Sequence, residues 1–187
     1  MATTIHIDEE KRSRLREGLH QYALKRGDFV LASGARSSFY INIKELSLRG
    51  EFLRLIGELL WPMMAELKPD AVGGMTLGAD PIVSAVTIVA AEQGIDCPAL
   101  IVRQEAKDHG TGRRIEGSFE KGMRVAVVED VTTTGGSAKR AADAIIEAGG
   151  TVVGVFSVMN REAGADRMFA DLNWPFRAIF GMDDLDI

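Results

Sequence analysis

The pattern of apolar and polar residues predicts alternating strands and helices over most of the chain. Short, continuous apolar runs predict buried strands over residues 71–75, 99–102, 124–128 and 151–158. Helical spacing of the apolar residues predicts intervening helices over residues 80–93, 136–148 and 163–170. Continuous apolar strands separated by helices are typical of a parallel sheet covered on both faces. We therefore predict an α/β fold, in which ligands bind beyond the carboxyl ends of the strands.

The beginning of the chain follows a different pattern. Apolar residues at helical spacing predict an amphipathic helix over residues 8–26, which ends at Gly27. Two short β-like runs, 29–31 and 39–41, flank a Ser-Gly turn and predict a hairpin, which we interpret as a small hood. A further amphipathic helix is predicted over residues 50–67 and leads into the sheet.

Composition narrows the class of protein. The 187 residues contain no repeat or linker, so we expect a single domain over residues 1–187, with a hood over about 1–45 and a core over about 46–187. The net charge of −5 gives no support to a nucleic-acid partner. The single cysteine, Cys97, excludes an intrachain disulfide and fits a reducing compartment. No secretory signal or membrane-spanning run is visible, so we expect a cytoplasmic protein without a membrane partner.

Residues 125–137 place the most specific chemistry at the end of a strand. An apolar run meets Glu129 and Asp130, and a turn rich in hydroxyls and glycine then opens a helix. Backbone N–H groups at such a helix start suit a phosphate, and the two carboxylates can accept hydrogen bonds from a ribose diol. An acidic strand end before an ordinary helix cap is the alternative interpretation. No Walker lysine and no G-x-G-x-x-G turn is present, so the whole arrangement favours a ribose 5-phosphate site.

This segment resembles the 5-phosphoribosyl-1-diphosphate signature of the type I phosphoribosyltransferases. The resemblance implies their fold, a central, mostly parallel sheet flanked by helices, with a small N-terminal hood. It also implies that the sugar diphosphate is bound by Glu129, Asp130, Val131, Thr132, Thr133, Thr134, Gly135, Gly136 and Ser137. The signature identifies the superfamily and leaves the base open.

The segment 103–117 is unusually long and polar for a connection in such a sheet. Its glycines and its four arginine and lysine residues make it a candidate lid over an anionic ligand. Lys107 and His109 could neutralise a departing pyrophosphate, and His109 could protonate it. A solvated surface loop is the alternative. The position of the segment 103–117 just before the phosphate motif favours a functional role.

Four residues of this segment, Arg103, Lys107, His109 and Gly110, resemble the catalytic loop of orotate phosphoribosyltransferases. The resemblance implies that Arg103, Lys107 and His109 bind the sugar diphosphate, and that Lys107 and His109 act in catalysis together with Asp130. It further implies a homodimer in which the loop serves the neighbouring subunit's active site. Gln104 stands where many members carry a basic residue, so Arg113 or Arg114 is a candidate for the missing contact.

Three further segments extend the resemblance to residues 10–180. The hairpin resembles the family's hood, and Phe39 and Tyr40 could stack on the base, although simple hairpin core is equally expected. Ala32 replaces a lysine that some members carry, for which Arg36 or Lys44 could compensate. Other predicted contacts lie at strand ends. Residues 73–81 resemble the family's pyrophosphate turn, and Thr133 and Arg161 are predicted to contact orotate. Asn160, next to Arg161, replaces the acid that the family carries there.

The resemblance implies one reaction. Orotate and 5-phosphoribosyl-1-diphosphate would give orotidine 5′-monophosphate and pyrophosphate, a step of de novo UMP biosynthesis. Mg²⁺ would assist while being held mainly by substrate and water, without a direct protein ligand. Two alternatives remain at this point: a phosphoribosyltransferase for another base, such as a purine, and a non-catalytic regulator that senses the sugar diphosphate.

Overall fold

A six-stranded sheet forms the centre of the computed structural model, which describes residues 8–30, 36–105 and 114–185. The strand order is β5-β4-β3-β6-β7-β8, and all neighbours are parallel except β4 and β5. The strands are β3 (Ala71–Met75), β4 (Ala99–Val102), β5 (Ile115–Glu116), β6 (Arg124–Thr132), β7 (Thr151–Asn160) and β8 (Phe176–Phe180). The predicted α/β architecture is confirmed.

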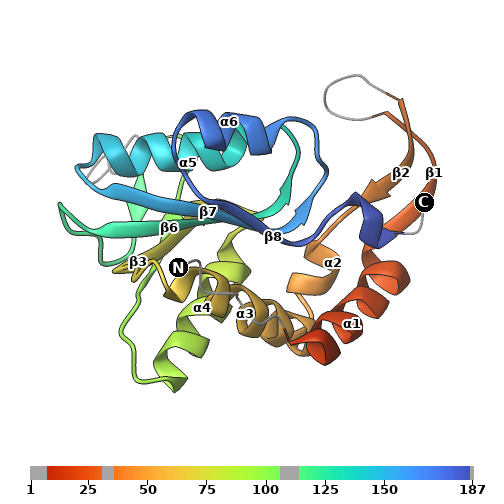
Figure 1. Ribbon diagram of the computed structural model, residues 1–187, viewed down its shortest axis with the longest axis horizontal. Coiled ribbons are helices and arrows are strands. Elements are labelled where there is room, and N and C mark those ends of the chain that lie inside the picture. The colour runs from red at the N-terminus through yellow and green to blue at the C-terminus, as the bar shows by residue number, and fades with distance from the viewer. Residues whose placement is uncertain (1–7, 31–35, 106–113, 186–187) are drawn as a thin grey trace.

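Helices cover both faces of this sheet (Figure 1). On one face lie α2 (Lys44–Ser47), α3 (Gly50–Ala65) and α4 (Asp80–Glu92), and on the other lie α5 (Gly136–Glu147) and α6 (Ala165–Asp171). Two apolar cores result, one on each side of the sheet. This double covering explains why all five residues of β3 are buried and why the central strands are continuously apolar. In the described part of the chain, no helix has the length and apolar character needed to cross a membrane.

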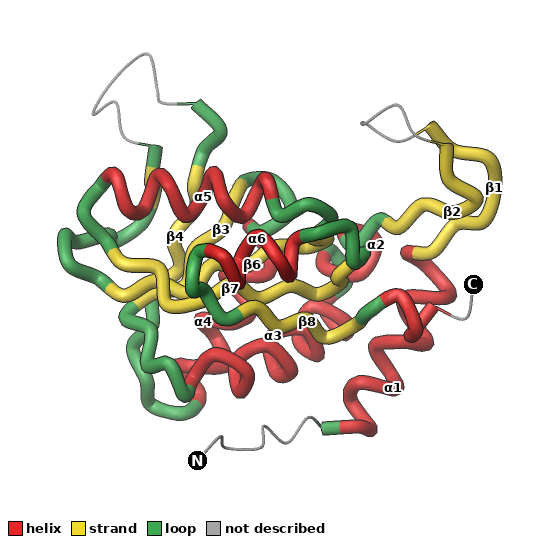
Figure 2. Tube along the Cα trace, turned by 45° about the horizontal axis from the view of Figure 1, so that its top comes forward, coloured by secondary structure: helices red, strands yellow, loops and turns green. Residues whose placement is uncertain are grey.

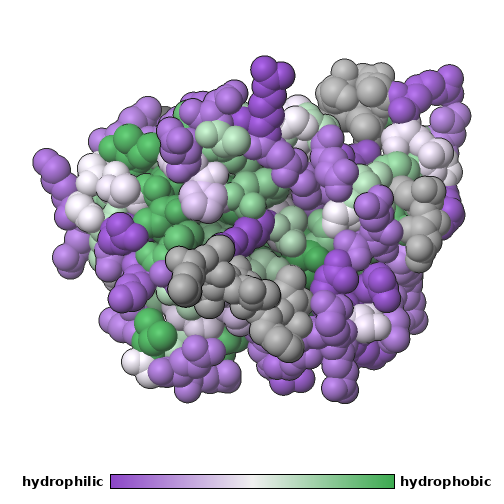
Figure 3. All heavy atoms as spheres, in the orientation of Figure 1, coloured by the Kyte–Doolittle hydropathy of each residue, from purple (hydrophilic) through white to green (hydrophobic). Residues whose placement is uncertain are grey.

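The N-terminal region forms α1 (Glu9–Gly18), a π-helical turn η1 (Leu19–Ala23) and an antiparallel hairpin of β1 (Leu24–Val30) and β2 (Arg36–Ile41). The hairpin extends away from the central sheet (Figure 2). Hydrophilic side chains gather on the described part of the hairpin (Figure 3). The helix predicted over residues 8–26 is wrong at its end, because Leu24 leaves the helix and pairs with Ile41. This cross-strand pairing overrides the apolar spacing that continues beyond Ala23.

Other strand assignments also differ from the prediction: β7 runs two residues further, to Asn160, and both hairpin strands begin earlier than predicted. Strand β6 continues four residues beyond Val128, because Glu129, Val131 and Thr132 pair with β7. Strand β5 was not predicted, and it has only two residues. Strand β8 was not predicted either; it lies at the edge of the sheet, and its first three residues are half-buried. The chain ends its described part in a 3₁₀ turn, η2 (Met182–Leu185).

Candidate active site

Three neighbouring parallel strands end at the same edge of the sheet: β3 at Met75, β6 at Thr132 and β7 at Asn160. Two contacts show that the segments after these strands lie together. The backbone N–H of Arg161 donates to the carbonyl of Thr132 at 2.8 Å. A methyl group at Gly78 would lie 2.6 Å from the carboxylate of Asp130. The candidate site predicted from the strand ends is therefore assembled around β6.

The two adjacent acids end the continuous buried run of β6, which begins at Val125. Glu129 is 7% exposed and Asp130 is 8% exposed. Both oxygens of Asp130 are oriented by donors: Oδ1 accepts from the Val131 N–H at 2.8 Å, and Oδ2 accepts from Lys44 Nζ at 3.1 Å. Glu129 differs, since its Oε2 is buried without a hydrogen-bond partner among the described residues. Burial, and next the negative charge of Asp130, raise the pKa of Glu129 to about 8. Glu129 is therefore mostly protonated at neutral pH, whereas Asp130 is held by two donors.

This raised pKa predicts a pH-dependent stability. The folded protein binds a proton at Glu129 that the unfolded chain releases above its ordinary pKa of 4.5. Stability contributed by this proton is present at low pH and is lost as the pH rises toward about 8. Glu129→Gln removes the titration, so the variant should gain about 3 to 4 kcal/mol relative to wild type between pH 5 and pH 8. Urea unfolding at several pH values measures this difference. A difference that stays constant with pH would contradict the assignment to Glu129.

The turn after β6 forms a helix N-terminus suited to an anion. Gly135 has a φ of +81°, a left-handed conformation that favours glycine, and it precedes α5 without a side-chain cap. A methyl group at Gly135 would collide with Met168 and Phe169, so the turn packs directly against α6. The first N–H groups of α5 can therefore donate to a phosphate. The side chains of the turn contribute hydroxyls: Thr133 and Thr134 are exposed.

A cationic and aromatic pair lies at the end of β7. The guanidinium of Arg161 lies over the ring of Phe39, 4.9 Å from its centroid. Tyr40 points to the opposite side of β2, as alternation in a strand requires, and packs against Phe29 with ring centroids 5.7 Å apart. Asn160 has a local role, because its side chain donates to Asp166 at 3.1 Å and accepts from the backbone of Glu162. Of the two predicted aromatic contacts, the structure brings Phe39 beside Arg161.

The glycine-rich turn after β3 approaches the same acids. Thr76 donates its hydroxyl to Asp80 Oδ2 at 2.8 Å, and this fixes the start of α4. The other oxygen, Oδ1 of Asp80, is buried and has no partner in the part of the chain that the structure describes. Because Gly78 lies against Asp130, only a residue without a side chain fits there. The predicted pyrophosphate turn therefore lies next to the predicted sugar site.

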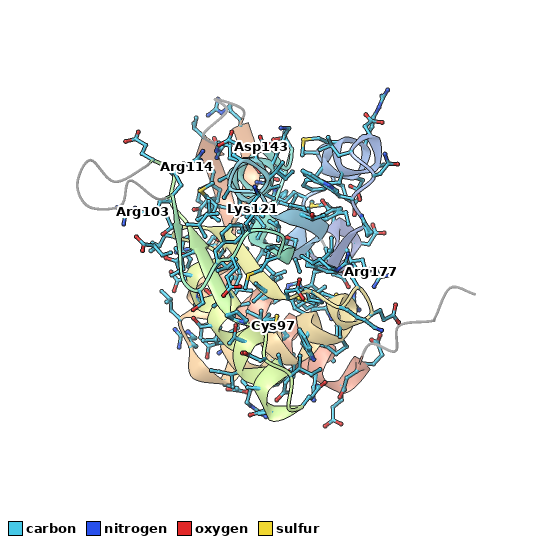
Figure 4. The ribbon with its side chains drawn as sticks, turned by 90° about the vertical axis from the view of Figure 1, so that its left-hand side faces the viewer. Cys97, Arg103, Arg114, Lys121, Asp143 and Arg177 are labelled. Atoms are coloured by element: carbon cyan, nitrogen blue, oxygen red, sulfur yellow. The ribbon has the colours of Figure 1, made fainter. Side chains whose placement is uncertain are left out.

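The long polar segment 103–117 leaves the sheet after β4 and returns to it at β5, which pairs with β4. The N–H of Arg103 donates to the carbonyl of Arg114 at 2.8 Å, and Figure 4 shows the two residues close together at the sheet edge. Arg103 Nη1 also lies 3.7 Å from Glu116. Arg114 Nη1 lies 3.8 Å from Glu147, near the end of α5 farthest from the phosphate turn. The residues Ala32, Lys107, His109, Gly110 and Arg113 lie outside the described residues.

Comparison with known proteins identifies the family. No protein-family model matches the chain. The curated orotate phosphoribosyltransferase of Corynebacterium glutamicum is 43% identical over 181 residues, which cover 97% of each chain. A phosphoribosyltransferase structure from Corynebacterium diphtheriae has a TM-score of 0.84 at 38% identity and covers 95% of this chain and 99% of that one. The orotate phosphoribosyltransferase of Mycobacterium tuberculosis H37Rv, solved in complex with 5-phospho-α-D-ribosyl 1-diphosphate, has a TM-score of 0.80 at 34% identity, with the same coverage.

The chain belongs to the orotate phosphoribosyltransferase family. It is accordingly a pentosyltransferase of pyrimidine biosynthesis, which forms orotidine 5′-monophosphate from orotate and the sugar diphosphate. The family and the reaction predicted from the motifs are confirmed. The relatives carry the orotate name, so neither a purine nor a purely regulatory role is supported.

Sequence reasoning did not predict several contacts that the orotate phosphoribosyltransferase fold makes at this site. Gly78 contacts Asp130, and Arg140 donates to the Ser137 hydroxyl at 3.0 Å, which adds a cation beside the phosphate turn. Lys44 was named only as a substitute for a missing hood lysine, yet it pairs with Asp130. The spacing of Arg140 three residues after Ser137 on a helix could have indicated its contact. The other contacts depend on tertiary structure.

Proposed function

We propose that Glu129 and Asp130 bind the ribose hydroxyls of the sugar diphosphate, while residues 131–137 bind its 5-phosphate. The observation that carries this proposal is the position of Asp130, a buried carboxylate with both oxygens oriented, directly before the uncapped start of α5. A diol donates two hydrogen bonds, and a helix N-terminus attracts a phosphate, so the two ends of a ribose 5-phosphate match this order. The complex of the M. tuberculosis relative with the sugar diphosphate supports the same ligand.

Orotate would lie between the hood and the end of β7. Arg161 offers a forked donor for the orotate carboxylate, and Phe39 beside it offers an aromatic face to the ring. The hydroxyl of the exposed Thr133 is available to the base or its carboxylate. Tyr40 remains a weaker candidate, because it packs on Phe29. A charged, planar substrate is the kind of ligand that such a pair selects.

The departing pyrophosphate would be met by Arg103, Lys107 and His109. The pairing of Arg103 with Arg114 fixes the two ends of the segment that carries Lys107 and His109, which supports a common role for these residues. We propose that this segment serves the active site of the partner subunit in a homodimer. The enzyme would act in the cytoplasm, and its charge of −5 suits small substrates rather than nucleic acid or membrane.

The chemistry would rest on positioning and on charge stabilisation. The acidic N1–H of orotate first releases its proton to water, which leaves a ring dianion. The bond between C1 of the ribose and the pyrophosphate oxygen breaks, C1 becomes oxocarbenium-like, and N1 of the dianion forms the new bond to C1. Lys107 and His109 would stabilise the negative charge that develops on the leaving group, and Asp130 would keep the ribose in place. Mg²⁺ prefers oxygen ligands, and here it would be held mainly by oxygens of the substrate and by water. It would neutralise the negative charge of the diphosphate.

A direct assay tests this proposal. Orotate consumption is followed with purified protein, sugar diphosphate and Mg²⁺, and parallel reactions contain adenine, hypoxanthine or uracil. We expect turnover with orotate alone, and a rate at least about tenfold lower when EDTA removes Mg²⁺. Turnover with a purine and none with orotate would overturn the base assignment. Full turnover in EDTA would overturn the role of Mg²⁺.

A further inference from the structure

We propose that Lys44 is a positioning residue, which orients the Asp130 carboxylate toward the sugar. The inference rests on the proposed role of Asp130 in binding the ribose. Lys44 Nζ donates to Asp130 Oδ2 at 3.1 Å across 86 positions of sequence. Because the Val131 N–H donates to Oδ1, the lysine supplies the second of two donors that fix the plane of the carboxylate. Lys44 itself need not touch the substrate for this role.

The backbone presents Lys44 in a fixed position. Lys44 is the first residue of α2, and its neighbours Ile43 and Leu46 are fully buried in the core beneath the sheet. The N–H of Asn42 donates to the carbonyl of Ala23, which anchors the preceding residues. A side chain that starts from such a rigid segment loses less freedom when it forms an ion pair. The pair is thus preorganised before substrate arrives.

Charge gives the second reason for a lysine at this position. The sugar diphosphate brings further negative charge close to the Asp130 carboxylate. In the described part of the chain, Lys44 is the cation that forms a salt bridge with Asp130. Its side chain is 39% exposed while that of Asp130 is 12% exposed, so the pair lies where water enters. A pair this exposed stabilises a fold only weakly, so its main effect should be on ligand binding.

Lys44 also joins the hood to the sugar site. It follows β2 by three residues, and β2 carries Phe39, which lies against Arg161. Arg161 in turn donates its backbone N–H to Thr132, two residues after Asp130. The hood therefore touches this edge of the sheet twice, at Arg161 and at Asp130.

The test is a double-mutant cycle in which calorimetry measures the Kd for the sugar diphosphate. Lys44→Met should raise Kd about tenfold in the wild-type background, and have little effect in the Asp130→Asn background, where the charge that it orients is already gone. Lys44→Arg keeps the charge and should bind within about threefold of wild type. An unchanged Kd for Lys44→Met, equal effects in both backgrounds, or an Arg variant as weak as Met would overturn the inference.

Lys11→Met is the matched control. Lys11 pairs with Glu58 at 2.9 Å with side chains 41% and 15% exposed, nearly the values of the Lys44 pair. The two residues lie on α1 and α3, which carry none of the residues assigned to the site. The Kd of Lys11→Met should equal that of wild type. Melting temperatures are compared for all variants, and Lys44→Gln replaces the Met variant if that one is unstable. If wild-type protein fails to bind the sugar diphosphate, the proposed function fails; if wild type binds and Lys44→Met binds equally, only the present inference fails.

Discussion

Asp130→Asn is expected to weaken binding of the sugar diphosphate by about ten- to a hundredfold and to lower kcat/KM at least as much. The asparagine has nearly the same size but loses the charge and one acceptor. The ribose hydroxyls then lose a charge-assisted hydrogen bond. Lys44 loses its ionic partner as well. We expect the fold to survive, because the Val131 N–H can still donate to the amide oxygen.

Calorimetry with the sugar diphosphate and steady-state kinetics measure this effect. Asp143→Asn is the control, because Asp143 also pairs with a lysine, Lys139 at 2.7 Å, on the exposed side of α5. This variant should bind and turn over like wild type. An Asp130→Asn protein with wild-type affinity and an unchanged melting temperature would remove Asp130 from the sugar site.

The sheet could be predicted because its signal is local. Strands β3, β6 and β7 are buried on both faces over most of their length, and β4 alternates half-buried and buried residues. Each therefore contains an apolar run, and each helix between them repeats at 3.6 residues. Strand β8 lacks this signal, because an edge strand is covered less completely and its first three residues are half-buried. The end of η1 was missed for another reason: Leu24 becomes a strand only through pairing with Ile41. Local patterns do not contain such contacts.

The same division applies to the active site. Glu129, Asp130 and the turn that follows are contiguous, so their chemistry can be recognised from one segment. Lys44 and Gly78 reach Asp130 from other elements, and neither carries a local signal for that contact. Phe39 and Tyr40 were equally good candidates in the sequence, and strand alternation separates them once the position of Arg161 is known. The substrate class can thus be predicted from motifs, whereas the residues that orient them require the fold.

Lys107→Ala is expected to lower kcat by about a hundred- to a thousandfold while the affinity for orotate changes little. If Lys107 meets the leaving pyrophosphate, its contribution grows as the bond to C1 breaks, and such an interaction affects turnover more than ground-state binding. The substitution removes one charge from a segment that is polar in sequence, so we expect an unchanged melting temperature. Pre-steady-state and steady-state kinetics with saturating sugar diphosphate measure the change. Undiminished turnover would exclude Lys107 from the reaction.

Mixing the Lys107→Ala protein with the Asp130→Asn protein then tests whether sites are shared. If Lys107 acts on the partner's site, each mixed dimer contains one site with both residues intact, and random exchange should restore about a quarter of wild-type activity. If Lys107 acts within its own subunit, every site in the mixed dimer lacks one residue and activity stays at the level of the two mutants. Exchange is confirmed by mass spectrometry of differently tagged subunits, so that absence of recovery cannot result from absence of mixing. Recovered activity would show that a complete active site requires two chains.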